Sequence, residues 1–265
     1  MAESSHFYSR QGEPKFEVPY ADASKGMRKA TLADAKKNGW LPSVTTITRV
    51  LNAPALVDWK VRNGIMAALT TPRNENEPLD DFVNRILAVD VESIGDAAKQ
   101  LGTDIHDDIE SYLTNGGVKR PDLIPYISPV AQEVKLLGNV IATEKILVGD
   151  CYAGRTDCIL ESDELITVVD FKTTGSKQLP KKSYAEHRIQ LAGYAAALGN
   201  TGNKRISTLN IYISTIRAGE IAVCKNEDWQ TDFEIFKKVC DIWQWQNNYF
   251  PSREESTEEN FDIMP

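Results

Sequence analysis

The spacing of apolar residues follows a helical period through the first half of the chain. Apolar side chains recur every three or four residues in a stretch that begins near Ser43 and in three longer stretches, residues 54–69, 94–112 and 121–137. This spacing predicts four helices. The polar segment 70–78 is predicted to be a loop.

After residue 140 the helical spacing gives way to short runs of apolar residues, which are typical of strands. Strands are predicted where such runs are bounded by polar turns, at residues 142–148, 154–160, 165–173, 206–214 and 220–225. Helical spacing returns at residues 183–198 and 228–249. Helices followed by a sheet with an inserted helix predict an α/β fold that is preceded by a helical region.

This pattern divides the chain into three parts. Residues 1–40 are polar and turn-rich, which predicts an arm laid over the surface. Residues 41–250 form the predicted main domain, with a helical region at 41–140 and an α/β core at 141–250. Residues 251–265 are acidic and lack an apolar period, so we expect a disordered tail, and its apolar tip could contact a partner protein.

Composition narrows the class of protein. With 42% hydrophobic and 26% charged residues among 265, the chain can bury a full core. It has neither an apolar run long enough for a membrane nor a signal-like N-terminus, so we expect a soluble intracellular protein. The net charge of −8 argues against a protein that coats nucleic acid non-specifically.

The four cysteines are expected to be buried free thiols. Cys151, Cys158, Cys224 and Cys240 contain no C-x-x-C pair, and the first two fall in strand-like segments. This spacing favours neither a disulfide nor a zinc site.

A carboxylate and a lysine interrupt the most apolar predicted strand. Residues 165–169 are apolar on both faces, which is typical of a central strand, and Asp170 and Lys172 follow. Burial disfavours a charged carboxylate by several kcal/mol unless a cation or hydrogen bonds compensate. Lys172 shares the face of Asp170 because side chains alternate along a strand.

The preceding strand carries a second carboxylate. If the loop of this hairpin has an even number of residues, Asp157 lies opposite Asp170, and a divalent cation between them would keep both charged. A loop with an odd number would turn Asp157 to the other face. The alternative is an ordinary ion pair of Asp170 and Lys172 at the end of a strand.

Further polar residues surround this predicted hairpin. His106 lies beside the apolar stripe of its helix and could bind a divalent metal, although a lone histidine is commonly structural. Gln190 and Tyr194 lie four residues apart on one helical face, where they could hydrogen-bond lysine, water or phosphate. Glu144 in the first strand could supply another acid.

Three motifs in this order carry a family resemblance. Gly154-Arg155-Thr156-Asp157, Asp170-Phe171-Lys172 and Gln190-Leu191-Ala192-Gly193-Tyr194, with His106 upstream, resemble the G-x-x-D, D-x-K and Q-x-x-x-Y motifs of the RecB-type branch of PD-(D/E)xK nucleases. Residues 42–47 and 58–60 further resemble phage-encoded exonucleases and the mitochondrial genome maintenance exonucleases. The resemblance to phage enzymes implies the cytoplasm of a bacterial or phage-infected cell.

The resemblance implies a restriction-endonuclease-like core, with a central mixed sheet flanked by helices, and a divalent-metal-dependent DNA nuclease. Asp157, Asp170 and His106 would bind Mg²⁺ or Mn²⁺, together with the backbone carbonyl of Phe171. Lys172 would act on the attacking water and the phosphate, and Gln190 and Tyr194 would position Lys172 and DNA. The cysteine spacing of the iron–sulphur relatives is missing, so we expect no cluster.

The helical region would restrict entry to a flexible strand, which predicts an exonuclease that prefers single-stranded ends. An endonuclease of the same superfamily and a non-catalytic DNA-binding module on this fold are the alternatives. Basic and aromatic residues that could contact DNA form two groups, near the helical region and near the site: Arg49, Trp59, Lys60 and Arg62, and Arg155, Lys181, Lys182 and Arg188.

Overall fold

The computed structural model describes residues 6–51, 54–88, 91–199, 201–226 and 228–252; within these ranges the side chains of residues 23, 54–60, 88 and 91–98 are not described. The predicted sheet is present. It has five strands in the order β5 (Asn139–Val148), β6 (Ala153–Glu161), β7 (Leu165–Thr174), β8 (Arg205–Ser214) and β9 (Ile221–Asn226). Strands β7 and β8 are parallel and the other neighbours are antiparallel, so the sheet is mixed.

Eight α-helices are present in the described ranges. They are α1 (Leu32–Asn38), α2 (Val44–Thr48), α3 (Pro54–Thr70), α4 (Leu79–Ala88), α5 (Val91–Asn115), α6 (Ile124–Leu137), α7 (Ala185–Ala197) and α8 (Trp229–Asn247). A short 3-10 helix, η2 (Pro121–Leu123), directly precedes α6. The predicted helices and strands are confirmed to within a few residues, whereas α1 and α4 were not predicted.

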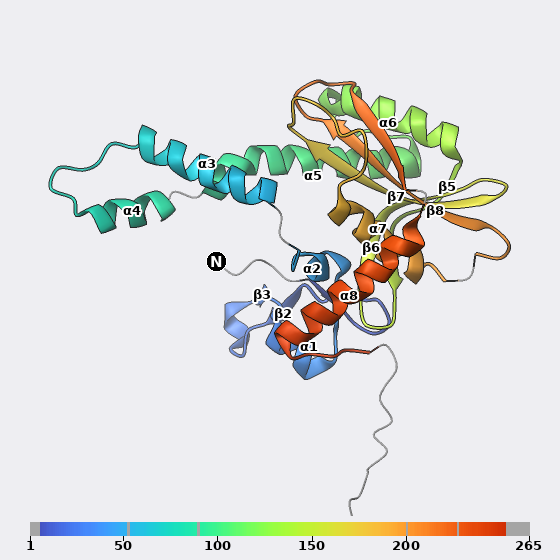
Figure 1. The fold of residues 1–265 in the computed structure, drawn as a ribbon, viewed down its shortest axis with the longest axis horizontal. Coiled ribbons are helices and arrows are strands. Elements are labelled where there is room, and N and C mark those ends of the chain that lie inside the picture. Colours follow the sequence, from blue (N-terminus) through green and yellow to red (C-terminus); the bar gives the residue numbers. More distant parts are fainter. Residues whose placement is uncertain (1–5, 52–53, 89–90, 200, 227, 253–265) are drawn as a thin grey trace, which may run out of the picture.

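Helices cover both faces of the sheet (Figure 1). On one face Ile159, Ile166 and Val168 pack in a core with residues of α2, α7 and α8. On the other face Val169 and Phe171 share a core with residues of α5 and α6. This arrangement explains why β7 is apolar on both faces, as expected of a covered central strand. The fold is therefore α/β with a central mixed sheet flanked by helices.

The N-terminal segment is more ordered than its polar composition predicts. It contains β1 (Phe7–Tyr8), which pairs with β4 (Leu41–Pro42), and β2 (Glu17–Pro19), which pairs with β3 (Met27–Lys29) after the 3-10 turn η1 (Ala23–Lys25). Its apolar residues enter the cores of the sheet, as the completely buried Phe7 does. The segment thus packs with the sheet.

The helical region does not form one compact layer. Helices α3 and α4 and the N-terminal part of α5 extend away from the sheet, and only the C-terminal part of α5 lies against it (Figure 1). None of the described helices combines the length and the apolar character that a bilayer-spanning segment needs.

Candidate active site

Strands β6 and β7 separate at the point where the two predicted carboxylates lie. Their pairing has the register expected for a loop with an even number of residues, here two, but it ends at Cys158 and Val169, one pair before Asp157 and Asp170. Beyond this point side chains bridge the strands. The Phe171 N–H donates a 2.7 Å hydrogen bond to Oδ2 of Asp157, and the Asp157 carboxylate therefore lies in the gap between the two strands.

Asp170 and Lys172 form a recessed ion pair on the α7 face of β7. Nζ of Lys172 lies 2.9 Å from each carboxylate oxygen of Asp170 and 3.2 Å from Oε1 of Gln190. The side chain of Asp170 is 3% exposed and that of Lys172 is 24% exposed. The side chain of Lys172 is thus partly exposed to the cavity, and the buried carboxylate of Asp170 balances its charge.

Amide groups from two neighbouring elements hold this pair. Nε2 of Gln190, on α7, donates to Oδ1 of Asp170 at 3.3 Å and to the hydroxyl of Tyr194 at 3.0 Å. Nδ2 of Asn210, on the parallel strand β8, donates to Oδ2 of Asp170 at 3.0 Å. Both oxygens of Asp170 therefore accept hydrogen bonds from side chains in two other elements.

The glycine of the first motif allows Tyr194 to approach the strand. A Cβ atom at Gly154 would lie 2.5 Å from Cε1 of Tyr194 and 3.1 Å from Cγ2 of Val44. Any larger residue would push Tyr194 away, and with it the amide of Gln190. Residues of the three motifs, on β6, β7 and α7, therefore pack against one another in the structure.

The electrostatics of the site reflect burial and the proximity of its charges. Burial raises the pKa of Asp170, and the nearby carboxylate of Asp157 adds to this effect, while Lys172 opposes it. Burial alone would lower the pKa of Lys172, but Asp170 and Asp157 outweigh it and the pKa is raised. Two carboxylates, Asp157 and Asp170, thus lie beside the single ammonium of Lys172, and a divalent cation would favour the charged form of both acids.

His106 and Glu144 approach Asp157 from two other elements. Nδ1 of His106, on α5, lies 3.7 Å from Oδ2 of Asp157. Glu144 lies in β5 between residues that pair with the two neighbours of Asp157, and burial raises its pKa to about 7. Oε2 of Glu144 lies 2.6 Å from Nε of Arg155. Glu144 is thus a third acid near the two predicted carboxylates, Asp157 and Asp170.

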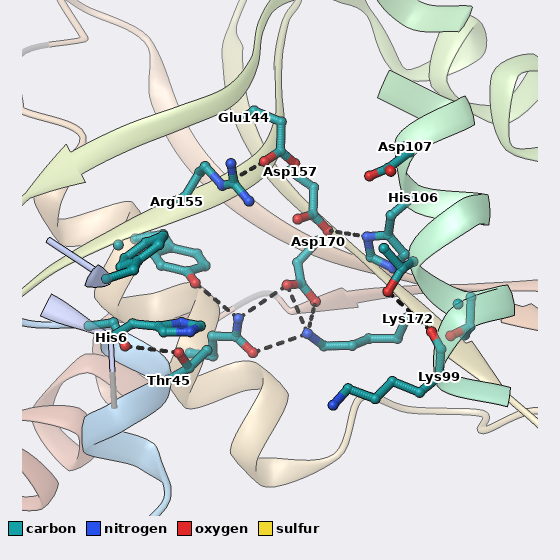
Figure 2. A pocket seen from close by; sticks show the side chains of 18 of the residues that line it. His6, Thr45, Lys99, His106, Asp107, Glu144, Arg155, Asp157, Asp170 and Lys172 are labelled. Atoms are coloured by element: carbon teal, nitrogen blue, oxygen red, sulfur yellow. Dashed lines mark hydrogen bonds and ion pairs between the residues drawn. The ribbon is translucent and has the colours of Figure 1, made fainter. Parts of the chain in front are cut away.

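These side chains line one cavity of about 500 Å³ (Figure 2). Strands β5, β6 and β7 supply its acids, α5 supplies His106, Lys99 and Asp107, and α7 supplies Gln190 and Tyr194. The cavity therefore brings together every predicted metal-binding side chain and the predicted lysine.

The predicted DNA-contacting residues lie in several places. Arg155 lines the cavity, and Lys181, Lys182 and Arg188 line a separate pocket between α7, β9 and α8. Arg49 and Arg62 are exposed outside both pockets. The side chains of Trp59 and Lys60 and the acidic residues 253–265 lie outside the described part of the chain.

The cysteines have no place in this cavity. Cys158, Cys224 and Cys240 are buried, and Cys151 is partly exposed. Cys151 was predicted in a strand, but it lies in the turn between β5 and β6, where its sulfur is 3.5 Å from that of Cys240.

A comparison with protein families identifies the superfamily of this chain. A model of the PD-(D/E)XK nuclease superfamily matches residues 65–257, which is more than half of the chain. The chain belongs to the PD-(D/E)XK nuclease superfamily. A comparison with curated proteins finds no match. Among solved structures, one described as the crystal structure of SSO0001 is 14% identical, with a TM-score of 0.33 over 71% of this chain and 86% of that chain.

Membership of the superfamily confirms the general class and leaves finer points open. PD-(D/E)XK nucleases act on DNA and generally use divalent metal ions such as Mg²⁺. The superfamily match does not distinguish its branches, so the resemblance to the RecB-type branch and to phage and mitochondrial exonucleases stays a prediction.

The donor set of the cavity suits such an ion in its chemistry. Carboxylates and an imidazole are ligands for Mg²⁺ and Mn²⁺. In the described part of the chain no three His, Cys, Asp or Glu side chains converge closely enough to hold a metal. The ammonium of Lys172 contacts both oxygens of Asp170 and balances the charge that a cation would otherwise balance.

Asn210, which contacts Asp170 from β8, and several residues that line the cavity were not predicted as site residues. Asn210 had a signal, because it is an amide within an apolar strand, Leu209-Asn210-Ile211. Lys99 and Asp107 share α5 with His106, but their helical positions gave no reason to prefer them. His6 and Phe16 come from the N-terminal segment, which no local pattern connects to the site.

Proposed function

We propose that this protein is a divalent-metal-dependent DNA exonuclease that prefers single-stranded ends. The observation that carries the proposal is the recessed pair Asp170–Lys172 beside Asp157, at the gap between β6 and β7. Two acids that can hold a metal ion and a lysine that can stabilise negative charge on the phosphate are groups suited to metal-assisted hydrolysis of a phosphodiester.

Metal ligation is assigned to Asp157, Asp170 and His106, with Glu144 and the backbone carbonyl of Phe171 as further candidates. A bound divalent cation would lower the pKa of water and offset the negative charge that develops on the phosphate. The tight hydrogen bond from Phe171 N–H to Asp157 fixes the carboxylate in the gap, which supports its role as a ligand.

Lys172 is assigned to the attacking water and the phosphate. Its ammonium is held by Asp170 and Gln190 and remains partly exposed to the cavity, so it can donate to an oxygen that enters there. Gln190 and Tyr194 position Lys172, because the amide of Gln190 contacts both the lysine and the tyrosine hydroxyl. Asn210 positions Asp170 in the same way.

The recess of the site supports a preference for flexible strands. Asp170 is almost completely buried and Asp157 is 18% exposed, so a phosphate must enter the cavity to reach them. Duplex DNA is stiff over about 150 base pairs, whereas a single strand can bend into the cavity between α5, the sheet and the N-terminal segment.

Digestion of three substrates tests this proposal: end-labelled linear single strands, linear duplex, and closed circular single strands, each with Mg²⁺ or Mn²⁺. We expect short products from linear single strands, slower degradation of duplex, and resistant circles. Rapid cleavage of the circles would show an endonuclease. Binding without cleavage of any substrate would support a non-catalytic DNA-binding module.

A further inference from the structure

The cavity has an aromatic wall in addition to its charged residues. His6, Tyr8 and Phe16, all from the N-terminal segment, line the same cavity as Asp157, Asp170 and Lys172. The rings of His6 and Phe16 are 4.5 Å apart with an interplanar angle of 31°, and Tyr8 meets Phe16 edge to face at 5.4 Å. Figure 2 shows His6 across the cavity from His106.

Hydrogen bonds fix the backbone of this wall beside the start of β6, the strand that carries Asp157. The backbone N–H of His6 donates to Oγ1 of Thr46 at 3.1 Å, and the carbonyl of His6 accepts from the N–H of Ser43 at 2.8 Å. Ser43 in turn forms a bridge with Ala153, the first residue of β6. The aromatic wall therefore has a fixed position relative to Asp157, four residues further along β6.

The rings differ in how much surface they expose. Tyr8 is only 4% exposed and serves as support, whereas His6 and Phe16 are half-buried. Burial lowers the pKa of His6, and the cations Arg49, Arg155 and Lys29 lower it further. His6 is thus a neutral ring in a cavity that Arg155 also lines, and this combination of a stacking surface and a positive charge suits a base and its phosphate.

We propose that His6 and Phe16 stack against an unpaired nucleobase of the strand whose phosphate lies at Asp157 and Asp170. This inference rests on the proposed function and names the residues that select single strands. A base within a duplex has both faces covered by its neighbours, whereas a base of a flexible strand can lie on an aromatic ring. Stacking tolerates any sequence, because every base has a π-face.

The test compares a short thymidine oligonucleotide with an abasic oligonucleotide that has the same phosphates. Affinities are measured by fluorescence anisotropy with Ca²⁺ in place of Mg²⁺, so that a cation is present at the carboxylates, and a gel confirms that the strands stay intact. Loss of one stacked base weakens binding by about tenfold. We therefore expect Phe16→Leu, which keeps most of the apolar volume, to weaken binding of the thymidine strand about tenfold and to leave binding of the abasic strand unchanged.

Phe233→Leu is the matched control, because Phe233 is also half-buried but lies on α8 outside the cavity. It should change neither affinity. His6→Ala provides a second variant and should act like Phe16→Leu. The inference would be overturned if Phe16→Leu and His6→Ala weakened binding of the thymidine and abasic strands equally, or left binding of the thymidine strand unchanged. Cleavage by the wild type would still support the proposed function in that case. Failure of the wild type to cleave, with base-dependent binding intact, would instead contradict the proposed function.

Discussion

At the scale of residues, Asp170 is the most constrained group of the site. It accepts hydrogen bonds from Lys172, Gln190 and Asn210, and these come from β7, α7 and β8. Positioning groups of this kind commonly change metal affinity or activity by 10- to 100-fold. The sequence predicted that Lys172 lies beside Asp170 and that Gln190 could contact the lysine, but neither the contact of Gln190 with Asp170 nor Asn210 was predicted, because the strand that pairs with β7 on that side was not known.

Lys172→Met should separate metal binding from turnover. The substitution removes the ammonium that contacts both oxygens of Asp170 and keeps the length of the side chain. We expect metal affinity to be retained or raised, because the carboxylate loses a competing cation. Cleavage should fall by roughly 100-fold or more, as for loss of a proton-transfer or charge-stabilising group.

Isothermal titration calorimetry with Mn²⁺ and initial rates on a labelled single strand measure the two effects. A Lys172→Met variant that binds no metal would contradict this division of roles, and so would one that keeps full activity.

Gly154→Ala should impair cleavage without removing any charged group. The added methyl would meet the ring of Tyr194 at 2.5 Å, and the tyrosine would displace the amide of Gln190. Overpacking of this kind costs about 1–3 kcal/mol in stability. The control is Gly64→Ala on α3, where nothing lies within 4 Å of the added atom. Thermal melts and cleavage rates that are equal for both variants would contradict the packing argument.

At the scale of elements, the hairpin could be predicted from local signals, but its register could not, because the sequence left open whether the loop has an even or an odd number of residues. The turn Asp163-Glu164 has two residues, and this even number places Asp157 and Asp170 on one face. The separation of β6 and β7 could not be predicted, because it depends on a carboxylate replacing a backbone group as hydrogen-bond acceptor. Helix α1 has a local signal in the sequence, the capping box of Thr31 and Asp34.

Helix α5 reaches the site through a close contact with β7. A Cβ atom at Gly102 would lie 2.7 Å from Oγ1 of Thr173. Gly102→Ala should therefore move α5 outward and displace His106, one turn later. Metal affinity should fall about tenfold, within the range for changes that disturb a ligand's support. Helix stability should gain up to about 1 kcal/mol from alanine, so the loss would not reflect unfolding.

Removal of the clashing hydroxyl should restore binding. The double variant Gly102→Ala with Thr173→Ala leaves only the Thr173 Cβ atom, 3.8 Å from the added methyl. Calorimetric metal titration should then return the affinity close to that of the wild type. If the double variant binds metal as weakly as Gly102→Ala, the contact with Thr173 does not position His106.

At the scale of the whole molecule, the arrangement of the distant segments could not be predicted. The order of helices and strands gave the α/β class, and the motifs gave the nuclease superfamily. The aromatic wall depends on pairing of β1 with β4, more than thirty residues away, for which the chain carries no local pattern. The extension of α3 and α4 away from the sheet is likewise a tertiary property (Figure 1).

Metal should stabilise the whole fold if the carboxylates bind it. A ligand present at 100 times its dissociation constant adds about 2.7 kcal/mol to the free energy of unfolding. We expect Mn²⁺ to raise the melting temperature of the wild type and EDTA to reverse the increase. Asp170→Asn should melt at a temperature that does not depend on Mn²⁺. An equal increase in both proteins would place the metal at another site.

The most direct test of the central claim is the rate at which Asp157→Asn and Asp170→Asn cleave an end-labelled single strand in Mg²⁺ or Mn²⁺. Each change keeps the size of the side chain and removes one carboxylate charge, so the fold should persist by circular dichroism. The account predicts that wild-type cleavage requires metal, and that each variant is at least about 100-fold slower. Cleavage by either variant at the wild-type rate would contradict the assignment of this site.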